Sequence, residues 1–139
     1  MLDALTEMAR VLKQDGLAII IIGRESRVRG QRFENGTLLY GLGVGGAGFG
    51  LVRRHERVFI NRFGERIVED LLVFAKDTGF PKRGYELARA LSVALLEKAR
   101  ENAPCEVARD IRGALANVER VAPSPIYDGP PHPVSMDTR

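Results

Sequence analysis

Four arginines are concentrated in one short polar segment of this 139-residue chain. They are Arg24, Arg27, Arg29 and Arg32. Guanidinium groups bind phosphate through paired, charge-assisted hydrogen bonds, so such a cluster suits a polyanionic partner. If all four bound phosphates, the log–log salt dependence of binding would steepen by about 3.6. The alternative is a solvated loop held by Glu25 and Glu34.

Two other polar side chains lie in the same segment, Ser26 and Asn35. Each can bond either the protein backbone or the edge of a base, and Asn35 can equally cap the helix expected after it. The predicted nucleic-acid contacts are therefore Arg24, Ser26, Arg27, Arg29, Arg32 and Asn35.

The element that positions this segment is the apolar run Leu17–Ile22. It is rich in β-branched residues and does not alternate with polar ones, which predicts an inner strand of a parallel sheet with both faces buried by helices. Residues 23–36 follow as a polar loop at the carboxyl end of that strand. Open α/β sheets bind ligands at this edge, so the arginines are well placed for a functional role.

The rest of the chain alternates helical and extended patterns. Apolar residues at helical spacing predict a helix over 2–13 and two more over 85–101 and 104–121. A short helix is expected over 37–44, weakened or ended by the glycines from 41 to 48. Two strands, 49–62 and 66–75, are joined by a tight turn at 63–65, and residues 76–82 are expected to be a linker.

Charged residues on these two strands have simpler interpretations. Arg53, Arg54 and Arg57 are expected on the exposed faces of a strand, with Arg54 pointing away from the other two. The adjacent Glu69 and Asp70 form either a like-charged pair with a raised pKa or ion pairs with nearby arginines, and ion pairing is the simpler interpretation.

Two segments resemble functional motifs without the right context. Residues 43–48 match the pattern G-x-G-x-x-G, but a nucleotide-binding loop needs a strand before it and a helix after it. A flexible turn is the prediction there. Residues 127–132 contain Asp-Gly-Pro-Pro within a proline-rich tail and are expected to be disordered.

Composition restricts the possible classes of protein. The net charge of +3 is mild, and Cys105 is the single cysteine, which excludes an internal disulfide. With two histidines and no clustered carboxylates, no metal site is predicted. The longest apolar run is too short to span a bilayer, so no membrane partner is expected. The single cysteine fits a reducing cytosol, so a cytoplasmic location is expected.

Several stretches together resemble bacterial site-specific DNA methyltransferases. The stretches are Ala-Arg-Val-Leu-Lys at 9–13, Gly-Arg-Glu-Ser at 23–26, Asn-Arg-Phe-Gly-Glu at 61–65 and Glu-Asp-Leu-Leu-Val-Phe at 69–74. The resemblance covers roughly residues 2–74 and extends more loosely to 126. It implies an S-adenosylmethionine-dependent enzyme of restriction-modification type that methylates an amino nitrogen of adenine or cytosine.

The resemblance also implies that the chemistry lies outside this chain. The family holds its cofactor with a glycine-rich loop after the first strand. It grips the flipped base with an Asp/Asn-Pro-Pro-Tyr/Phe loop after the fourth strand. Neither precedes Leu2, so no catalytic or cofactor-binding residue is assigned. The chain alone is expected neither to bind S-adenosylmethionine nor to methylate DNA.

The expected fold is the C-terminal part of a Rossmann-like α/β methyltransferase sheet over residues 1–75. A helical extension over 76–121 and a proline-rich flexible tail over 122–139 complete the chain. In the family, the last strand inserts antiparallel between the two strands before it. That order leaves one side of Leu17–Ile22 unpaired, and an apolar edge of this kind requires another strand.

Three sources of that strand remain open: the missing N-terminal half, a partner subunit or a second copy. Two other functions also remain open. One is a non-catalytic DNA-binding or complementing subunit, and the other is a fragment of an RNA or small-molecule methyltransferase.

Overall fold

The computed structural model describes residues 1–77 and 84–121. Most of the predicted linker, the proline-rich tail and the segment 127–132 lie outside these residues. The elements in chain order are α1 Leu2–Val11, β1 Leu17–Gly23, β2 Glu25–Val28, β3 Gln31–Glu34, α2 Asn35–Gly46, β4 Phe49–Ile60, β5 Arg66–Lys76, α3 Gly84–Glu101, α4 Cys105–Asn117 and the 3-10 helix η1 Val118–Arg120.

The main sheet has three strands in the order β1-β5-β4. The last strand, β5, lies in the middle and runs antiparallel to both neighbours, so β1 and β4 run parallel to each other. Leu72 of β5 sits opposite Ile20 of β1 and Arg54 of β4. The α/β class and the central place of the last strand agree with the sequence-based expectation.

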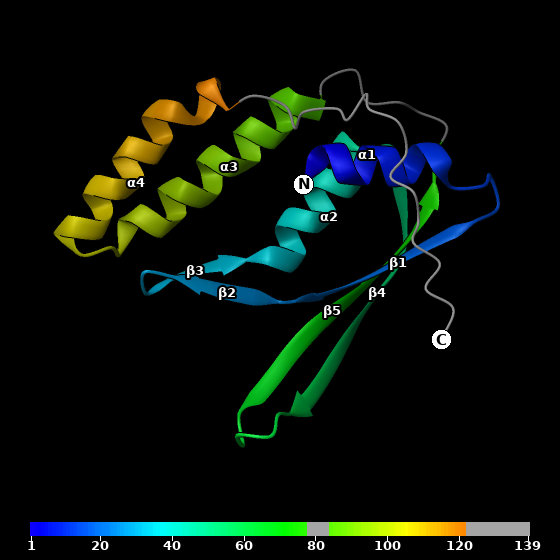
Figure 1. Ribbon diagram of the computed structural model, residues 1–139, viewed down its shortest axis with the longest axis horizontal. Coiled ribbons are helices and arrows are strands. Elements are labelled where there is room, and N and C mark those ends of the chain that lie inside the picture. Colours follow the sequence, from blue (N-terminus) through cyan, green and yellow to red (C-terminus); the bar gives the residue numbers. More distant parts are fainter. Residues whose placement is uncertain (78–83, 122–139) are drawn as a thin grey trace, which may run out of the picture.

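The hydrophobic core lies between this sheet and helices α1 and α2, which cover one of its faces (Figure 1). Phe49 and Phe74, from adjacent strands, are fully buried, and their rings stack with centroids 5.2 Å apart. Removing such aromatic side chains from water is the largest contribution that single residues make to a core of this size. The buried cluster comprises Leu2, Leu5, Ala9, Leu39, Leu42, Ala47, Phe49, Leu72 and Phe74.

The prediction that both faces of the apolar strand are buried is wrong for the residues that the structure describes. Ile20 packs against the core, but Ile19 is 63% exposed and Ile21 is 51% exposed. The reason is that α1 and α2 lie on the same side of the sheet, so every second side chain of β1 faces away from them. Among the described strands it also lies at the edge of the sheet and pairs antiparallel with β5, so the predicted inner strand of a parallel sheet is corrected, while its one unpaired side agrees with the expected strand order.

The short helix predicted over 37–44 is α2, which ends at Gly46, two residues later than predicted, with Gly41, Gly43 and Gly45 inside it. A side chain at Gly45 would place its Cβ 2.3 Å from Leu87 of α3, and one at Gly43 would lie 3.0 Å from the Phe74 ring. The glycines therefore allow α2 to pack closely against two neighbours at once. The predicted flexible turn over 43–48 is corrected to the end of a closely packed helix.

Strands β4 and β5 form a long hairpin that runs out beyond the helices (Figure 1). At its end, the Asn61 side-chain oxygen accepts hydrogen bonds from the backbone N–H groups of Phe63 and Glu65, at 2.9 and 3.0 Å. Gly64 takes a φ of +82°, which a residue with a side chain rarely adopts. The predicted tight turn is confirmed, and Asn61 is the residue that closes it.

The two C-terminal helices are also confirmed. Helix α3 packs on α2, where Leu91 lies against Gly41. Helix α4 lies beside α3 (Figure 1) and ends at Asn117, four residues before the predicted end, where η1 continues. None of the described helices is both long and apolar enough to cross a membrane.

Candidate nucleic-acid interface

Residues 25–34 form a second hairpin in place of the predicted loop. Strands β2 and β3 pair antiparallel, with Ser26 opposite Phe33 and Arg27 opposite Arg32. Their turn consists of Arg29 and Gly30, with φ values of 51° and 81°. Positive φ at both central residues is the geometry that tight two-residue hairpins favour. The strands are too short and too polar to show the alternation that identifies a strand in sequence.

Ser26 and Asn35 hold the base of this hairpin together. The Ser26 hydroxyl lies 3.0 Å from the Asn35 side-chain oxygen, and the Asn35 amide donates to the Gly23 carbonyl at 3.2 Å. Asn35 is the first residue of α2, and Glu34 is its N-cap, so the suggested capping role for Asn35 is corrected. Both side chains are thus used within the protein.

Arg24 belongs to a network of ion pairs around a buried carboxylate. Its guanidinium donates to Asp70 at 2.8 and 3.2 Å and contacts Glu56 at 2.5 Å. Arg54 donates to the other oxygen of Asp70 at 2.7 Å. These hydrogen bonds to Asp70 and Glu56 raise the pKa of Arg24 further above its ordinary value. Arg24 therefore holds the fold together where the sequence suggested a phosphate contact.

Asp70 is fully buried, and burial alone would raise the pKa of its carboxyl. The hydrogen bonds from Arg54 and Arg24 outweigh this effect and lower the pKa below its ordinary value. The first turn of α2 lies directly over the carboxylate, because a Cβ on Gly36 would be 2.0 Å from an oxygen of Asp70. The ion-pairing interpretation is confirmed for Asp70, and likewise for Glu69, which pairs with Arg57 at 2.7 Å.

The far end of the β2–β3 hairpin is attached to α4. Arg29 pairs with Glu106 at 2.8 Å and also with Asp110, both on that helix. Arg32 pairs with Glu25, as the alternative interpretation of the segment expected. The other expected counterion, Glu34, instead accepts a hydrogen bond from Lys98 at 3.0 Å, which lowers the pKa of the Glu34 carboxyl.

Arg27 is the cluster member without an ion pair to any residue that the structure describes. It lies directly opposite Arg32, so two guanidinium groups share one face of the hairpin. Like charges opposite each other across a strand pair are destabilising, and a bound anion would relieve the repulsion. Among the predicted contacts, Arg27 is the one that the geometry leaves available to an anionic ligand, with Arg32, already paired with Glu25, opposite it.

The structure also brings basic and aromatic residues together where sequence reasoning saw only a turn. Arg62, Phe63 and Arg66 lie at the outer end of the β4–β5 hairpin and are exposed. The sequence signal for this surface was the Asn-Arg-Phe-Gly turn between two strands. A turn at the end of a hairpin leaves its arginine and phenylalanine exposed to solvent.

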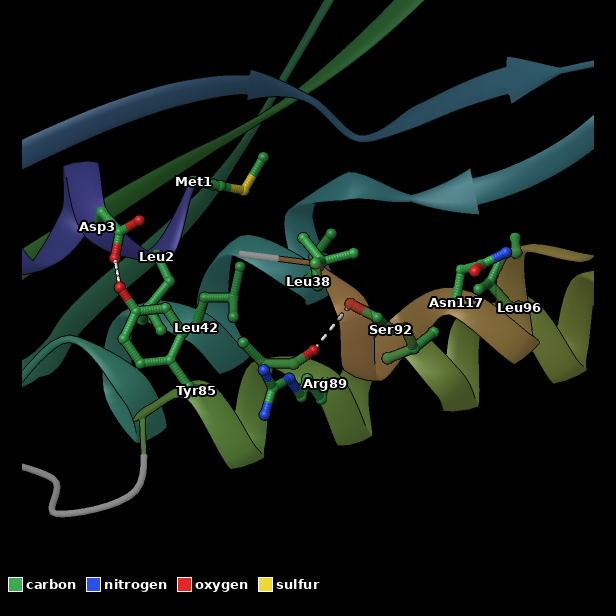
Figure 2. A pocket seen from close by; sticks show the side chains of 14 residues that line it. Met1, Leu2, Asp3, Leu38, Leu42, Tyr85, Arg89, Ser92, Leu96 and Asn117 are labelled. Atoms are coloured by element: carbon green, nitrogen blue, oxygen red, sulfur yellow. Dashed lines mark hydrogen bonds between the residues drawn. The ribbon is translucent and has the colours of Figure 1, made fainter. Parts of the chain in front are cut away.

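A cleft of about 560 Å³ lies between α1, α2, α3 and the segment around η1 (Figure 2). Its walls are mainly apolar, with Leu38 and Leu42 on α2. Two of its polar groups bond other residues of the lining: the Tyr85 hydroxyl donates to Asp3, and the Ser92 hydroxyl donates to the Ala88 carbonyl at 2.8 Å. That bond to Asp3 raises the pKa of Tyr85. The cleft thus presents mainly apolar packing surface, with Tyr85 and Asp3 bonded to each other.

Neither protein-family models, nor curated proteins, nor solved structures gave a match to this chain. Within residues 1–77 and 84–121, no group of three or more His, Cys, Asp or Glu side chains is placed to hold a metal ion. The geometry of the two hairpins is therefore the basis for any functional interpretation.

Proposed function

We propose that residues 1–75 are the C-terminal part of a DNA methyltransferase domain that uses S-adenosylmethionine to methylate a base amino nitrogen. The observation that carries the proposal is the strand order. β5 lies antiparallel between β1 and β4, and α2 connects the two parallel strands. A crossover followed by a hairpin into the middle of the sheet is the arrangement that the resembling family uses to close its sheet.

The open side of β1 also supports this proposal. Its outer edge pairs with no described strand, and Leu17, Ile19 and Ile21 are more than half exposed. Apolar edges of this kind are sites of aggregation unless another strand or a covering element protects them. In the proposed enzyme, the strand beside β1 comes from the part that carries the cofactor and the catalytic loop.

The contribution of this chain would then be to DNA binding. The β2–β3 hairpin follows directly from the carboxyl end of β1, where open α/β sheets bind their ligands. Arg27 and Arg32 would neutralise phosphates there, while Arg24, Ser26 and Asn35 hold the base of the hairpin in place. S-adenosylmethionine would supply the methyl group, and we assign no residue of this chain to its site.

The coding DNA upstream of the Met1 codon provides the direct test. An in-frame sequence with a glycine-rich loop followed by an Asp/Asn-Pro-Pro-aromatic loop is expected. An in-frame stop codon with neither loop would contradict the proposal and direct attention to a separate partner chain.

Calorimetric titration of the purified chain with S-adenosylmethionine tests the placement of the cofactor site. No saturable heat is expected, and no methyl transfer to DNA. A single-site isotherm would contradict the assignment of the cofactor site to another part of the enzyme.

A second function is favoured by the same open edge: a complementing subunit that binds DNA without catalysis. In that case, β1 would pair with a partner chain or with a second copy of this chain. Sedimentation velocity separates the cases, because a monomer that persists at high concentration without aggregation argues against self-pairing.

A further inference from the structure

The outer end of the β4–β5 hairpin, residues 59–66, combines exposed apolar and basic side chains. We refer to it as the arm tip. Phe63 is 73% exposed and Ile60 is 63% exposed, and Figure 1 shows the hairpin extending away from the helices. Large apolar side chains held so far from the core mark a contact surface more often than a packing requirement.

The arginines of the arm tip differ from most of those in and beside the β2–β3 hairpin in their partners. Arg62 and Arg66 form no ion pair with any residue in the described parts of the chain, and neither does Arg27, whereas Arg24, Arg29 and Arg32 all do. The carboxylate nearest in sequence, Glu65, accepts a hydrogen bond from the Asn61 amide at 2.9 Å. The two guanidinium groups are thus left available for an external anion.

Aromatic rings accompany the charges. The Arg62 guanidinium lies 4.6 Å from the centre of the Phe63 ring, and Arg57 lies 5.0 Å from that of Phe59. Surfaces that bind nucleic acids combine these two groups, because guanidinium groups pair with phosphates while flat rings stack on bases. Of these two arginines, Arg57 also pairs with Glu69, whereas Arg62 has its ring contact and no ion pair among the described residues.

The shape of the arm also fits a nucleic acid. The major groove of DNA admits a two-stranded β-ribbon, and the Asn61 hydrogen bonds fix the turn that presents Phe63. We propose that the arm tip is a DNA contact of this chain. Arg62 and Arg66 bind phosphates, and Phe63 stacks on or wedges between bases. This inference takes DNA as the partner from the proposed function, but it involves a different surface from the β2–β3 hairpin.

The test is fluorescence anisotropy of the full chain with a labelled DNA duplex over a series of salt concentrations. The double variant Arg62→Ala/Arg66→Ala should bind more weakly and lower the magnitude of the log–log salt slope by about 1.8. Phe63→Ala should weaken binding by at least about fivefold with little change in slope, because it removes stacking and no charge.

The matched control is the double variant Arg109→Ala/Arg112→Ala on the exposed side of α4. It removes the same charge from two arginines that, like Arg62 and Arg66, have no ion pair in the described residues. It should leave the salt slope nearly unchanged. Equal losses in both double variants would show that only net charge matters and would overturn the inference. Circular dichroism confirms that each variant folds.

The remaining outcomes separate this inference from the proposed function. If DNA binds but the arm variants match the parent chain, the arm is not the contact, while the upstream coding sequence still decides the enzyme assignment. If Phe63→Ala changes the sedimentation coefficient and leaves DNA affinity unchanged, the arm tip is a protein contact and the inference fails.

Discussion

The turn ends of the two hairpins treat their arginines in opposite ways. In the β2–β3 hairpin, Arg29 and Arg32 pair with carboxylates, and the turn is attached to α4. In the β4–β5 hairpin, Arg62 and Arg66 at the outer end pair with no described residue. Density of arginines along the sequence therefore does not identify the surface that is free to bind an anion, because tertiary packing decides which charges are already neutralised.

The hairpins share one anchor, the carboxylate of Asp70. Arg24, just before β2, and Arg54, on β4, reach its two oxygens from different elements. A charge this deeply buried is retained only when its hydrogen bonds are nearly complete, and breaking such a group leaves the others uncompensated. Asp70 should thus control the stability of both hairpins together.

Replacing Asp70 should have the largest effect on the stability of the chain. We expect Asp70→Asn to lower the free energy of unfolding by about 3 kcal/mol, because two guanidinium groups lose their shared counterion in a buried site. Urea denaturation of the full chain measures this. The neighbouring substitution Glu69→Gln breaks a more exposed pair and should cost less than about 1 kcal/mol. Equal losses of unfolding free energy in the two variants would show that Asp70 contributes no more to stability than the more exposed Glu69.

A substitution at Gly36, which packs directly against the Asp70 carboxylate, should have the next largest effect on stability. Gly36→Ala should destabilise the chain by about 2 kcal/mol, since the new methyl group would overlap an oxygen of Asp70 and force the ion pair apart. Gly113→Ala is the matched control, because nothing lies within 4 Å of its added Cβ in the middle of α4. That control should stabilise the chain by about 0.5 to 1 kcal/mol. A neutral Gly36→Ala in thermal melts would contradict the close packing of α2 on Asp70.

Much of the fold could be predicted from the sequence because its signals are local. The helical spacing of α1, the apolar run of β1 and the turn after Asn61 each carry their own pattern. The central place of β5 came from the family resemblance. The β2–β3 hairpin was missed because its strands have four residues each and no hydrophobic alternation.

The candidate site was harder to predict, because its charges depend on contacts far apart in the chain. Arg24 meets Asp70 across 46 positions, and Arg29 meets Glu106 across 77. No local pattern distinguishes these arginines from Arg27, which pairs with no described carboxylate. The exposed face of β1 was missed for a related reason: an apolar run shows that burial is needed but does not show whether the covering element belongs to the same chain.

Acid should weaken the ion pairs that Asp70 forms with Arg24 and Arg54. The pKa of Asp70 is lowered in the folded chain, so its carboxylate stabilises the fold above the unfolded pKa of about 3.9. This contribution is lost as the pH falls through the lower, folded pKa. The difference in unfolding free energy between the parent chain and Asp70→Asn should be constant near neutrality and shrink below about pH 4. A difference that does not depend on pH would mean that Asp70 is not ionised in the folded chain.

The smallest effect should come from Arg27, and it has opposite signs in two assays. Arg27→Glu replaces a repulsive cross-strand pair with an attractive one opposite Arg32, so the β2–β3 hairpin should gain about 0.5 kcal/mol. If this pair binds phosphate, the same substitution should weaken DNA binding and reduce its salt dependence. Urea denaturation and anisotropy titrations measure the two effects. A more stable variant with unchanged DNA affinity would assign the β2–β3 hairpin to structure alone and leave the arm tip as the DNA contact. There, Arg62 and Arg66 form no ion pair with any described residue, and Phe63 is 73% exposed.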